Sequence, residues 1–206
     1  MARSEVAEER RMAIVAAAVR VLAREGLSET TTRKIATEAG VNQAMIGYYF
    51  GGKDELLHAV LRELMRRTGE IAGASLPPSA SFAEALAGAI EAFWAHVEAT
   101  PELEVMQYEL TLYALRNPAS AWLAKSQYAG YGEVVASLIE RVCAATGERI
   151  AVAPDALARF IIGGLDGLIL QYVSDRDTER ARGDLRRLTA AALALARGAT
   201  GNGASA

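Results

Sequence analysis

Residue types that bind nucleic acid gather in one short part of this 206-residue chain, between residues 32 and 53. An arginine reaches a phosphate or the edge of a guanine, a glutamine pairs with adenine, and an alanine methyl touches the methyl of thymine. Tyrosine and lysine bind the phosphate backbone and fix the register of a protein on DNA. The candidate DNA-binding positions are Thr32, Arg33, Asn42, Gln43, Ala44, Gly47, Tyr48, Tyr49 and Lys53.

Residues that could catalyse a reaction are scattered by contrast. His58 and His96 fall on different predicted helices, and Cys143 has no histidine near it in sequence. The acidic residues between 102 and 109 lie on different faces of a helix start, where carboxylates favour the helix dipole. The sequence has neither a glycine-rich phosphate loop nor a cysteine cluster for zinc. We therefore expect no enzyme, no cofactor and no metal site, and turnover of a ligand by pure protein would contradict this.

The nucleic-acid-binding segment also has the residue sizes of a helix-turn-helix. Ala36 is small where the second helix would cross the first, and Gly40 allows a left-handed residue in the turn. Ile35, Val41 and Ile46 would supply the apolar core of the pair. The spacing alone leaves open an ordinary helical hairpin. In either case the pair is too small to stand alone, so the first helix and the start of the fourth must complete its core.

The segment resembles the tetracycline-repressor (TetR) family over about residues 10–60. The matching runs are Thr31-Thr32-Arg33-Lys34-Ile35-Ala36, then Ala39-Gly40-Val41, then Tyr48-Tyr49-Phe50-Gly51-Gly52-Lys53-Asp54-Glu55-Leu56-Leu57. Matches in this order at fixed spacing are highly specific. Gly47 departs from the pattern, because the family more often has tyrosine or another polar side chain there. A glycine costs about 1 kcal/mol of helix stability and removes one contact to DNA.

Chemistry and the family pattern together assign roles to these positions. Thr32 is expected to cap the second helix and to offer its N-terminus to a phosphate. Asn42 is expected to cap the recognition helix, with Gln43 and Ala44 facing base edges. The remaining contacts, Tyr48, Tyr49 and Lys53, are expected to touch the DNA backbone without reading sequence. For Tyr49, packing inside the motif is an equal alternative.

Apolar residues recur at spacings of three and four throughout, and no strand-like alternation persists, so we predict an all-α fold of about nine helices. Glycine, proline and a Ser81–Glu84 capping box mark helix ends. The predicted helices cover residues 4–24, 32–39, 43–50, 53–74, 81–101, 101–117, 119–146, 155–173 and 179–197.

The charge distribution supports a division into domains. Residues 1–67 have 11 Lys and Arg against 9 Asp and Glu, whereas the rest has 11 against 16, so the amino-terminal third alone is basic. We predict a DNA-binding domain over 1–52, completed by the start of the helix at 53–74. A ligand-binding and dimerisation core would follow over 53–198, with a disordered tail at 199–206.

A dimer is expected because one recognition helix reads only one half-site, and two half-sites lie about 34–36 Å apart. The predicted dimer interface is formed by the helices 155–173 and 179–197, the first of which is apolar nearly all round. Its glycines are costly inside a helix unless another helix approaches closely. Charged residues in this helix exclude a membrane span, so we expect a protein that does not enter a membrane. A single cysteine indicates a reducing cytoplasm.

The family resemblance implies an effector pocket in the middle helices, where most aromatic residues lie. Their mixture with polar groups predicts a small, largely apolar effector. The candidate pocket residues are Phe93, Trp94, His96, Met106, Glu109, Tyr113, Trp122, Gln127, Tyr128, Tyr131 and Asp166. Each one taken singly is more often core or surface than a ligand contact.

The sequence thus predicts a ligand-responsive transcriptional regulator, a repressor that leaves a palindromic double-stranded operator when its effector binds. The helix 53–74 would couple the pocket to the DNA-binding domain. Two alternatives stay open at this point. One is a helical scaffold or protein-interaction module without sequence-specific DNA binding, and the other is a regulator that needs its ligand to bind or that activates.

Overall fold

The computed structural model describes residues 2–74 and 81–198 of the chain. Over these residues it has nine α-helices, one 3-10 turn and no strand, which confirms the predicted all-α fold. The chain divides into two compact units, Met1–Arg66 with Thr100–Tyr128 and Arg67–Ala99 with Ala129–Ala206. The predicted tail at 199–206 lies outside the described residues.

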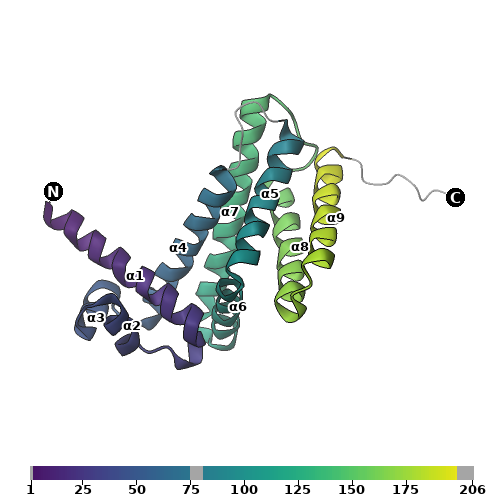
Figure 1. The fold of residues 1–206 in the computed structure, drawn as a ribbon. Coiled ribbons are helices and arrows are strands. Elements are labelled where there is room, and N and C mark those ends of the chain that lie inside the picture. The colour runs from purple at the N-terminus through teal and green to yellow at the C-terminus, as the bar shows by residue number, and fades with distance from the viewer. Residues whose placement is uncertain (1, 75–80, 199–206) are drawn as a thin grey trace. The chain divides into compact units, whose positions relative to one another are not determined.

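The first unit joins the amino-terminal helices to a later segment of the chain (Figure 1). It contains α1 (Ala2–Glu29), α2 (Thr32–Ala39), α3 (Gln43–Phe50), the first part of α4 (Lys53–Ala74), α6 (Pro101–Arg116), the 3-10 turn η1 (Pro118–Ser120) and the start of α7 (Ala121–Thr146). One buried cluster takes side chains from all six of these helices, with Ile14, Ile35, Ile46, Leu57, Met106 and Leu123 among its members. The helix-turn-helix therefore does have its core completed by neighbours, as its small size requires.

Helix α1 changes direction at Gly26. The backbone there has φ 77° and ψ 168°, so helical geometry is interrupted at the glycine two residues after the predicted helix end at residue 24, and α1 then continues to Glu29. A side chain at this φ is strained, and a Cβ would also lie 3.3 Å from both carboxylate oxygens of Glu109. The hydroxyl of Thr30 donates a 2.6 Å hydrogen bond to the carbonyl of Gly26. These contacts set the path of the chain from α1 into α2.

The two helices of the motif have the predicted bounds and one unexpected cap. Thr31, in an extended conformation, is the N-cap of α2, and its hydroxyl accepts a 3.2 Å hydrogen bond from the backbone N–H of Lys34. The prediction that Thr32 is the cap is wrong, because Thr32 already has helical geometry and only the residue before it can fold its side chain back onto the first turn. Gly40 ends α2 with φ 66°, as predicted.

The second unit contains the remainder of the helices. These are α5 (Phe82–Ala99), the later parts of α4 and α7, α8 (Pro154–Asp175) and α9 (Thr178–Ala196). The helices α8 and α9 pack side by side (Figure 1), and a Cβ on Gly164 would overlap the side chain of Leu188. Arg182 of α9 binds Glu91 at 2.7 Å and Glu98 at 2.5 Å, which ties α9 to α5.

The ends of the later helices follow local signals. Ser81 and Glu84 form the predicted capping box, with the backbone N–H of Ser81 donating to the carboxylate of Glu84 at 2.8 Å. Pro101 begins α6 as expected. The predicted helix 119–146 begins slightly later, at Ala121, because the residues from Pro118 form the 3-10 turn first. The domain boundary at residues 52 and 53 stays a prediction.

Candidate nucleic-acid interface and effector-binding residues

The N-terminus of α3 is capped and linked to α2. Asn42 is extended, and its side-chain oxygen accepts a 2.9 Å hydrogen bond from the backbone N–H of Ala44, which confirms the predicted cap. The side-chain amide of Gln43 donates a 3.0 Å hydrogen bond to the hydroxyl of Thr32. Because this bond joins the first turns of α2 and α3, the two helix starts are held together at the surface.

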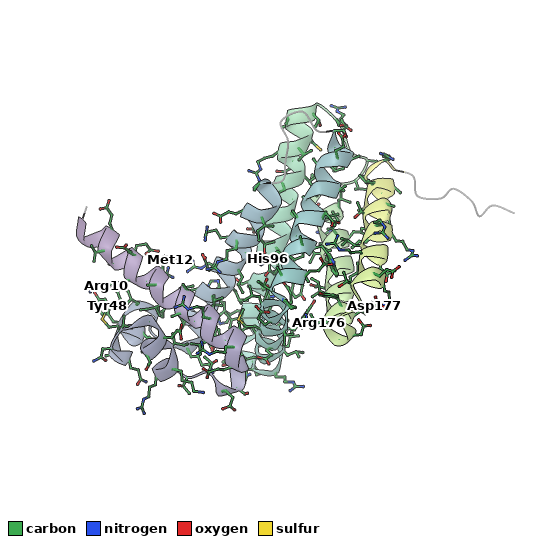
Figure 2. The ribbon with its side chains drawn as sticks, viewed as in Figure 1. Arg10, Met12, Tyr48, His96, Arg176 and Asp177 are labelled. Carbon is green, nitrogen blue, oxygen red and sulfur yellow. The ribbon has the colours of Figure 1, made fainter. Side chains whose placement is uncertain are left out.

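One face of α3 is open to solvent. Gln43, Ala44, Gly47 and Tyr48 are exposed at spacings of three and four, whereas Ile46 and Phe50 are buried. Tyr48, labelled in Figure 2, is 82% exposed. Its ring meets the half-buried ring of Tyr49 edge to face, with the centroids 5.1 Å apart. A tyrosine with so much of its side chain in water buries little surface in the fold, so this face has the properties of a binding surface.

Gly47 lies in the middle of this face. A Cβ added there would meet no atom within 4 Å, and its backbone is helical. The glycine is therefore not required by packing or by backbone geometry inside the chain. Because glycine has no side chain, the backbone of α3 between Gln43 and Tyr48 is accessible, and another molecule can approach it closely.

Ion pairs at the surface orient α2 against α1. Lys34 binds the carboxylate of Glu25 at 2.7 Å, and Arg20 binds that of Glu38 at 2.8 Å. The hydrogen bond from Lys34 holds the pKa of Glu25 below its ordinary value, and Arg20 does the same for the pKa of Glu38. Lys34 is thus engaged within the protein. Arg33, which lies next to it in α2, is exposed, so it is the better placed cation for DNA.

Helix α6 holds the chain where it enters the motif. Glu109 of α6 accepts a 2.7 Å hydrogen bond from the backbone N–H of Leu27, directly after the bend at Gly26. A free N–H at the start of a helical turn favours a carboxylate. Glu109 was predicted as an effector contact, and the structure places its carboxylate against α1.

The same helix holds the chain where it leaves the motif. Asp54, in the first turn of α4, accepts hydrogen bonds from the phenol of Tyr113 at 3.1 Å and the hydroxyl of Ser120 at 2.5 Å. The ammonium of Lys53 lies 5.8 Å from the centroid of the Tyr113 ring. Since Glu109 and Tyr113 are one turn apart on α6, a single helix face fixes both ends of the helix-turn-helix.

The predicted effector residues are divided between the two units. The first unit contains Met106, Glu109, Tyr113, Trp122, Gln127 and Tyr128, and the second contains Phe93, Trp94, His96, Tyr131 and Asp166. Within the first unit, Met106 is buried in the core and Gln127 accepts a 2.8 Å hydrogen bond from Thr111. The ring of Trp122 meets that of His58 edge to face at 4.7 Å. Burial, and then Arg62, lowers the pKa of His58.

In the second unit the largest aromatic side chain is part of the core. Trp94 is fully buried, its indole N–H donates a 3.0 Å hydrogen bond to Glu98, and its ring lies 5.5 Å from that of Tyr172. Phe93, His96 (labelled in Figure 2) and Tyr131 are half-buried. The indole of Trp94 is thus buried and hydrogen-bonded within the chain. The half-buried side chains have partly exposed surface that a ligand could contact.

The burial of two carboxylates in the first unit was not predicted from the sequence. Glu63 and Glu104 are 6% and 5% exposed, and Glu63 makes a 2.8 Å ion pair with Arg66. Glu104 accepts a hydrogen bond from Gln107 at 3.1 Å. The one available signal was periodic, since Glu63 lies three residues after Val60 and four after Ala59 on the buried side of α4. Within the described ranges, no group of three His, Cys, Asp or Glu could hold a metal ion.

Helix α8 is the one described helix that is long and apolar enough to cross a membrane by length and composition. In the window that meets this criterion, only 28% is buried inside the chain. Phe160 and Leu170 are exposed large apolar residues there, and a Cβ on Gly163 or Gly167 would meet nothing within 4 Å. The helix therefore presents an uncovered apolar face.

Comparison with known proteins accounts for this arrangement. Residues 14–60 match the family described as bacterial regulatory proteins, tetR family, and residues 77–195 match the tetracyclin repressor-like C-terminal domain. The chain is 30% identical over 173 residues to the HTH-type nicotine-responsive transcriptional repressor HdnoR of Paenarthrobacter nicotinovorans, covering 84% of this chain and 88% of that one.

Two solved structures share the fold. A tetR-family transcriptional regulator from Rhodococcus sp. aligns with a TM-score of 0.74 and 21% identity, over 92% of this chain and 99% of the other. The regulator FadR of Bacillus subtilis, solved with stearoyl-CoA, aligns with a TM-score of 0.65 and 23% identity, over 91% and 98% of the two chains.

Proposed function

This chain belongs to the tetR family of bacterial regulatory proteins, and we propose that it is a homodimeric repressor that leaves a palindromic operator when a small, largely apolar effector binds. The observation that carries the proposal is the capped, solvent-exposed start of α3, where Asn42 secures the helix and Gln43 and Ala44 face outward. A rigid helix start with exposed side chains is what the major groove admits. A protein with this target belongs in the cytoplasm.

The contacts to DNA divide into two kinds. Gln43 and Ala44 read base edges, and Arg33 reaches either a phosphate or a guanine. Tyr48, Tyr49 and Lys53 bind the DNA backbone and set the register of α3 in the groove. The hydrogen bond between Gln43 and Thr32 supports this division, because it orients the Gln43 amide before DNA arrives.

The dimer forms through α8 and α9, the helices that the sequence predicts over 155–173 and 179–197. The uncovered face of α8, with Phe160 and Leu170 exposed, supports this interface, because a second copy would remove that apolar surface from water. Gly163 and Gly167 would let the partner helix approach closely. Burial of this face in a dimer also accounts for the apolar composition of α8 in a protein that works on DNA.

The effector binds among the candidate residues of the middle helices. Proteins similar to this chain are associated with dissimilar molecules, since one is described as nicotine-responsive and another was solved in complex with stearoyl-CoA. Nicotine is small and largely apolar, which are the properties expected of the effector. It is therefore the first probe to test on this chain.

Coupling to DNA runs through the ends of the helix-turn-helix. The helix α4 follows α3 directly, and its first turn is fixed by Tyr113 and Ser120. Effector binding that displaces α4 or α6 would change the position of α3, and a typical coupling of about 1–3 kcal/mol would weaken operator binding some 5- to 150-fold.

The experiment that tests the proposal is selection of duplexes from a random DNA library by the purified protein at near-physiological salt. We expect a palindrome whose half-site centres are about one turn apart. Addition of nicotine and of other small apolar compounds should then release the selected duplex. Recovery of no sequence, or of sequences without symmetry, would favour the scaffold alternative, and binding only with a compound present would favour a ligand-dependent regulator.

A further inference from the structure

Helix α6 has an exposed apolar face in addition to its buried one. Val105, Leu112 and Leu115 are 41%, 53% and 66% exposed, and the half-buried Tyr108 lies between them. The spacings of three and four place these four residues, the α6 stripe, along one side of the helix. On the other side Met106, Leu110 and Ala114 are buried in the core of the first unit.

A surface helix of a soluble protein needs only one apolar face. The buried side of α6 already satisfies that need, and Val105, Leu112 and Leu115 stay exposed on the other side. Leaving several large apolar side chains in water along one line is unfavourable and indicates a partner surface.

The charges at the two ends of the stripe favour a second copy of this chain. Glu102 lies at one end and Arg116 at the other, and both are exposed. If two α6 helices pack antiparallel about a two-fold axis, Glu102 faces the partner's Arg116 at each end, and Val105 lies opposite the partner's Leu112. The pairing is self-complementary, as a two-fold interface must be.

We propose that the α6 stripe is a second dimer contact, made antiparallel with the α6 stripe of the partner subunit. The inference rests on the proposed dimer but concerns a surface other than α8 and α9. The stripe is about 15 Å long, at 1.5 Å per residue over its ten steps, which is too small to hold a dimer by itself. We expect the contact to affect the relative position of the two subunits more than the stability of the dimer.

The same helix fixes the DNA-binding motif, which gives the contact its consequence. Glu109 and Tyr113 hold the entry and exit of the helix-turn-helix, and they lie on the edge of α6 next to the stripe. A pair of α6 helices in contact would therefore set the distance between the two recognition helices. If the two stripes separated, the distance between the recognition helices would no longer be fixed, and simultaneous binding to two half-sites would be weaker.

Disulfide trapping tests the pairing and its direction. In a Cys143→Ser background, which has no other cysteine, the double variant Val105→Cys and Leu112→Cys places each thiol opposite the partner's other one. The two positions within one chain are about 10 Å apart along the helix, too far for a bond inside the chain. With a mild oxidant we expect a covalent dimer on a non-reducing gel.

The single variants are the matched controls. In the antiparallel register, identical positions are about 9–12 Å apart along the two helices, so Val105→Cys alone and Leu112→Cys alone should give several-fold less cross-linked dimer than the pair. An exposed position on α7, Glu140→Cys, reports random collision. Equal cross-linking in all variants, or none in the pair, would overturn the proposal.

A charge swap measures the consequence for DNA. Arg116→Glu should leave the protein dimeric but weaken operator binding about 2- to 30-fold, because each of two exposed ion pairs is replaced by a repulsion. Adding Glu102→Arg should restore binding.

If the cross-link fails while the library selection still yields a palindrome, the stripe proposal is wrong and the proposed function stands. If the cross-link forms and no duplex is selected, the stripe proposal stands and the proposed function is wrong. Occupation of the stripe by another protein would leave the pair uncross-linked.

Discussion

The carboxylate of Glu109 and the backbone N–H of Leu27 are joined by a 2.7 Å hydrogen bond across 82 positions of sequence. The bond lies directly after the bend at Gly26, where a Cβ would come within 3.3 Å of the same carboxylate. Helix α6 therefore determines how α1 leads into α2. This position makes Glu109 a structural support of the DNA-binding motif, whereas the sequence had suggested an effector contact.

Replacement of Glu109 should affect stability and DNA binding together. Glu109→Ala removes a charge-assisted hydrogen bond to a partly buried N–H, and we expect a loss of about 1–3 kcal/mol in the free energy of unfolding. Glu109→Gln keeps an acceptor and should lose less. Chemical denaturation of the two variants measures the difference. Unchanged stability, with loss of effector response only, would assign Glu109 to the pocket instead.

The caps of α2 and α3 give a comparison between neighbouring threonines. Thr31→Ala should cost about 1 kcal/mol of stability because its hydroxyl accepts from the backbone N–H of Lys34. Asn42→Ala should cost a similar amount for the same reason. Thr32→Ala loses only the surface bond from Gln43 and should cost less in the same thermal unfolding series. A larger loss at Thr32 than at Thr31 would contradict the capping geometry.

Gly47→Ala should stabilise the protein. The added methyl meets no atom within 4 Å, and alanine is favoured over glycine in a helix by about 1 kcal/mol. Urea denaturation followed by circular dichroism measures this gain. Gly40→Ala is the opposing control, because the backbone at Gly40 has φ 66° and an alanine there should destabilise the protein. If Gly47→Ala gains stability but weakens operator binding, close approach of DNA to the α3 backbone explains why glycine is present.

His58 should make the stability of the protein depend on pH. Burial lowers its pKa in the folded state, so the unfolded chain takes up a proton first as the pH falls. Stability is therefore full above the ordinary histidine value of about 6.5 and decreases as the pH falls from there to the folded pKa. We expect His58→Gln to flatten this slope in denaturation curves between about pH 7 and 5. The variant His96→Gln is the control, and it should keep the His58 contribution.

Structural features that depend on residues close together in the sequence, such as helix ends and caps, could be predicted from the sequence. Gly26 and Gly40 end helical geometry because their positive φ values favour glycine, and Asn42 and the Ser81–Glu84 pair cap the helices that follow them. The error of one residue at Thr31 has the same origin, because two adjacent threonines carry the same capping signal and only the backbone conformation distinguishes them.

Contacts between distant segments could not be predicted in this way. Asp54 and Tyr113 are 59 positions apart, and nothing in either local pattern indicates that they meet. Trp94 was a candidate for the effector pocket by residue type, whereas its complete burial and its bond to Glu98 depend on the packing of the second unit. Side chains suited to a ligand are also suited to a core, and only tertiary packing separates the two uses.

The division of labour on DNA can be tested with two substitutions. Gln43→Ala should change which bases are selected at one position of each half-site, with a loss of about 1–3 kcal/mol on the preferred sequence, because a bidentate contact to a base edge is removed. Lys53→Ala should weaken all sequences alike and reduce the slope of affinity against salt, because a phosphate contact is lost. Binding of matched and mismatched duplexes at two salt concentrations distinguishes these effects. If Gln43→Ala left base preference unchanged while Lys53→Ala altered it, α3 would sit in the groove in a different register, with its Tyr48 end reading sequence.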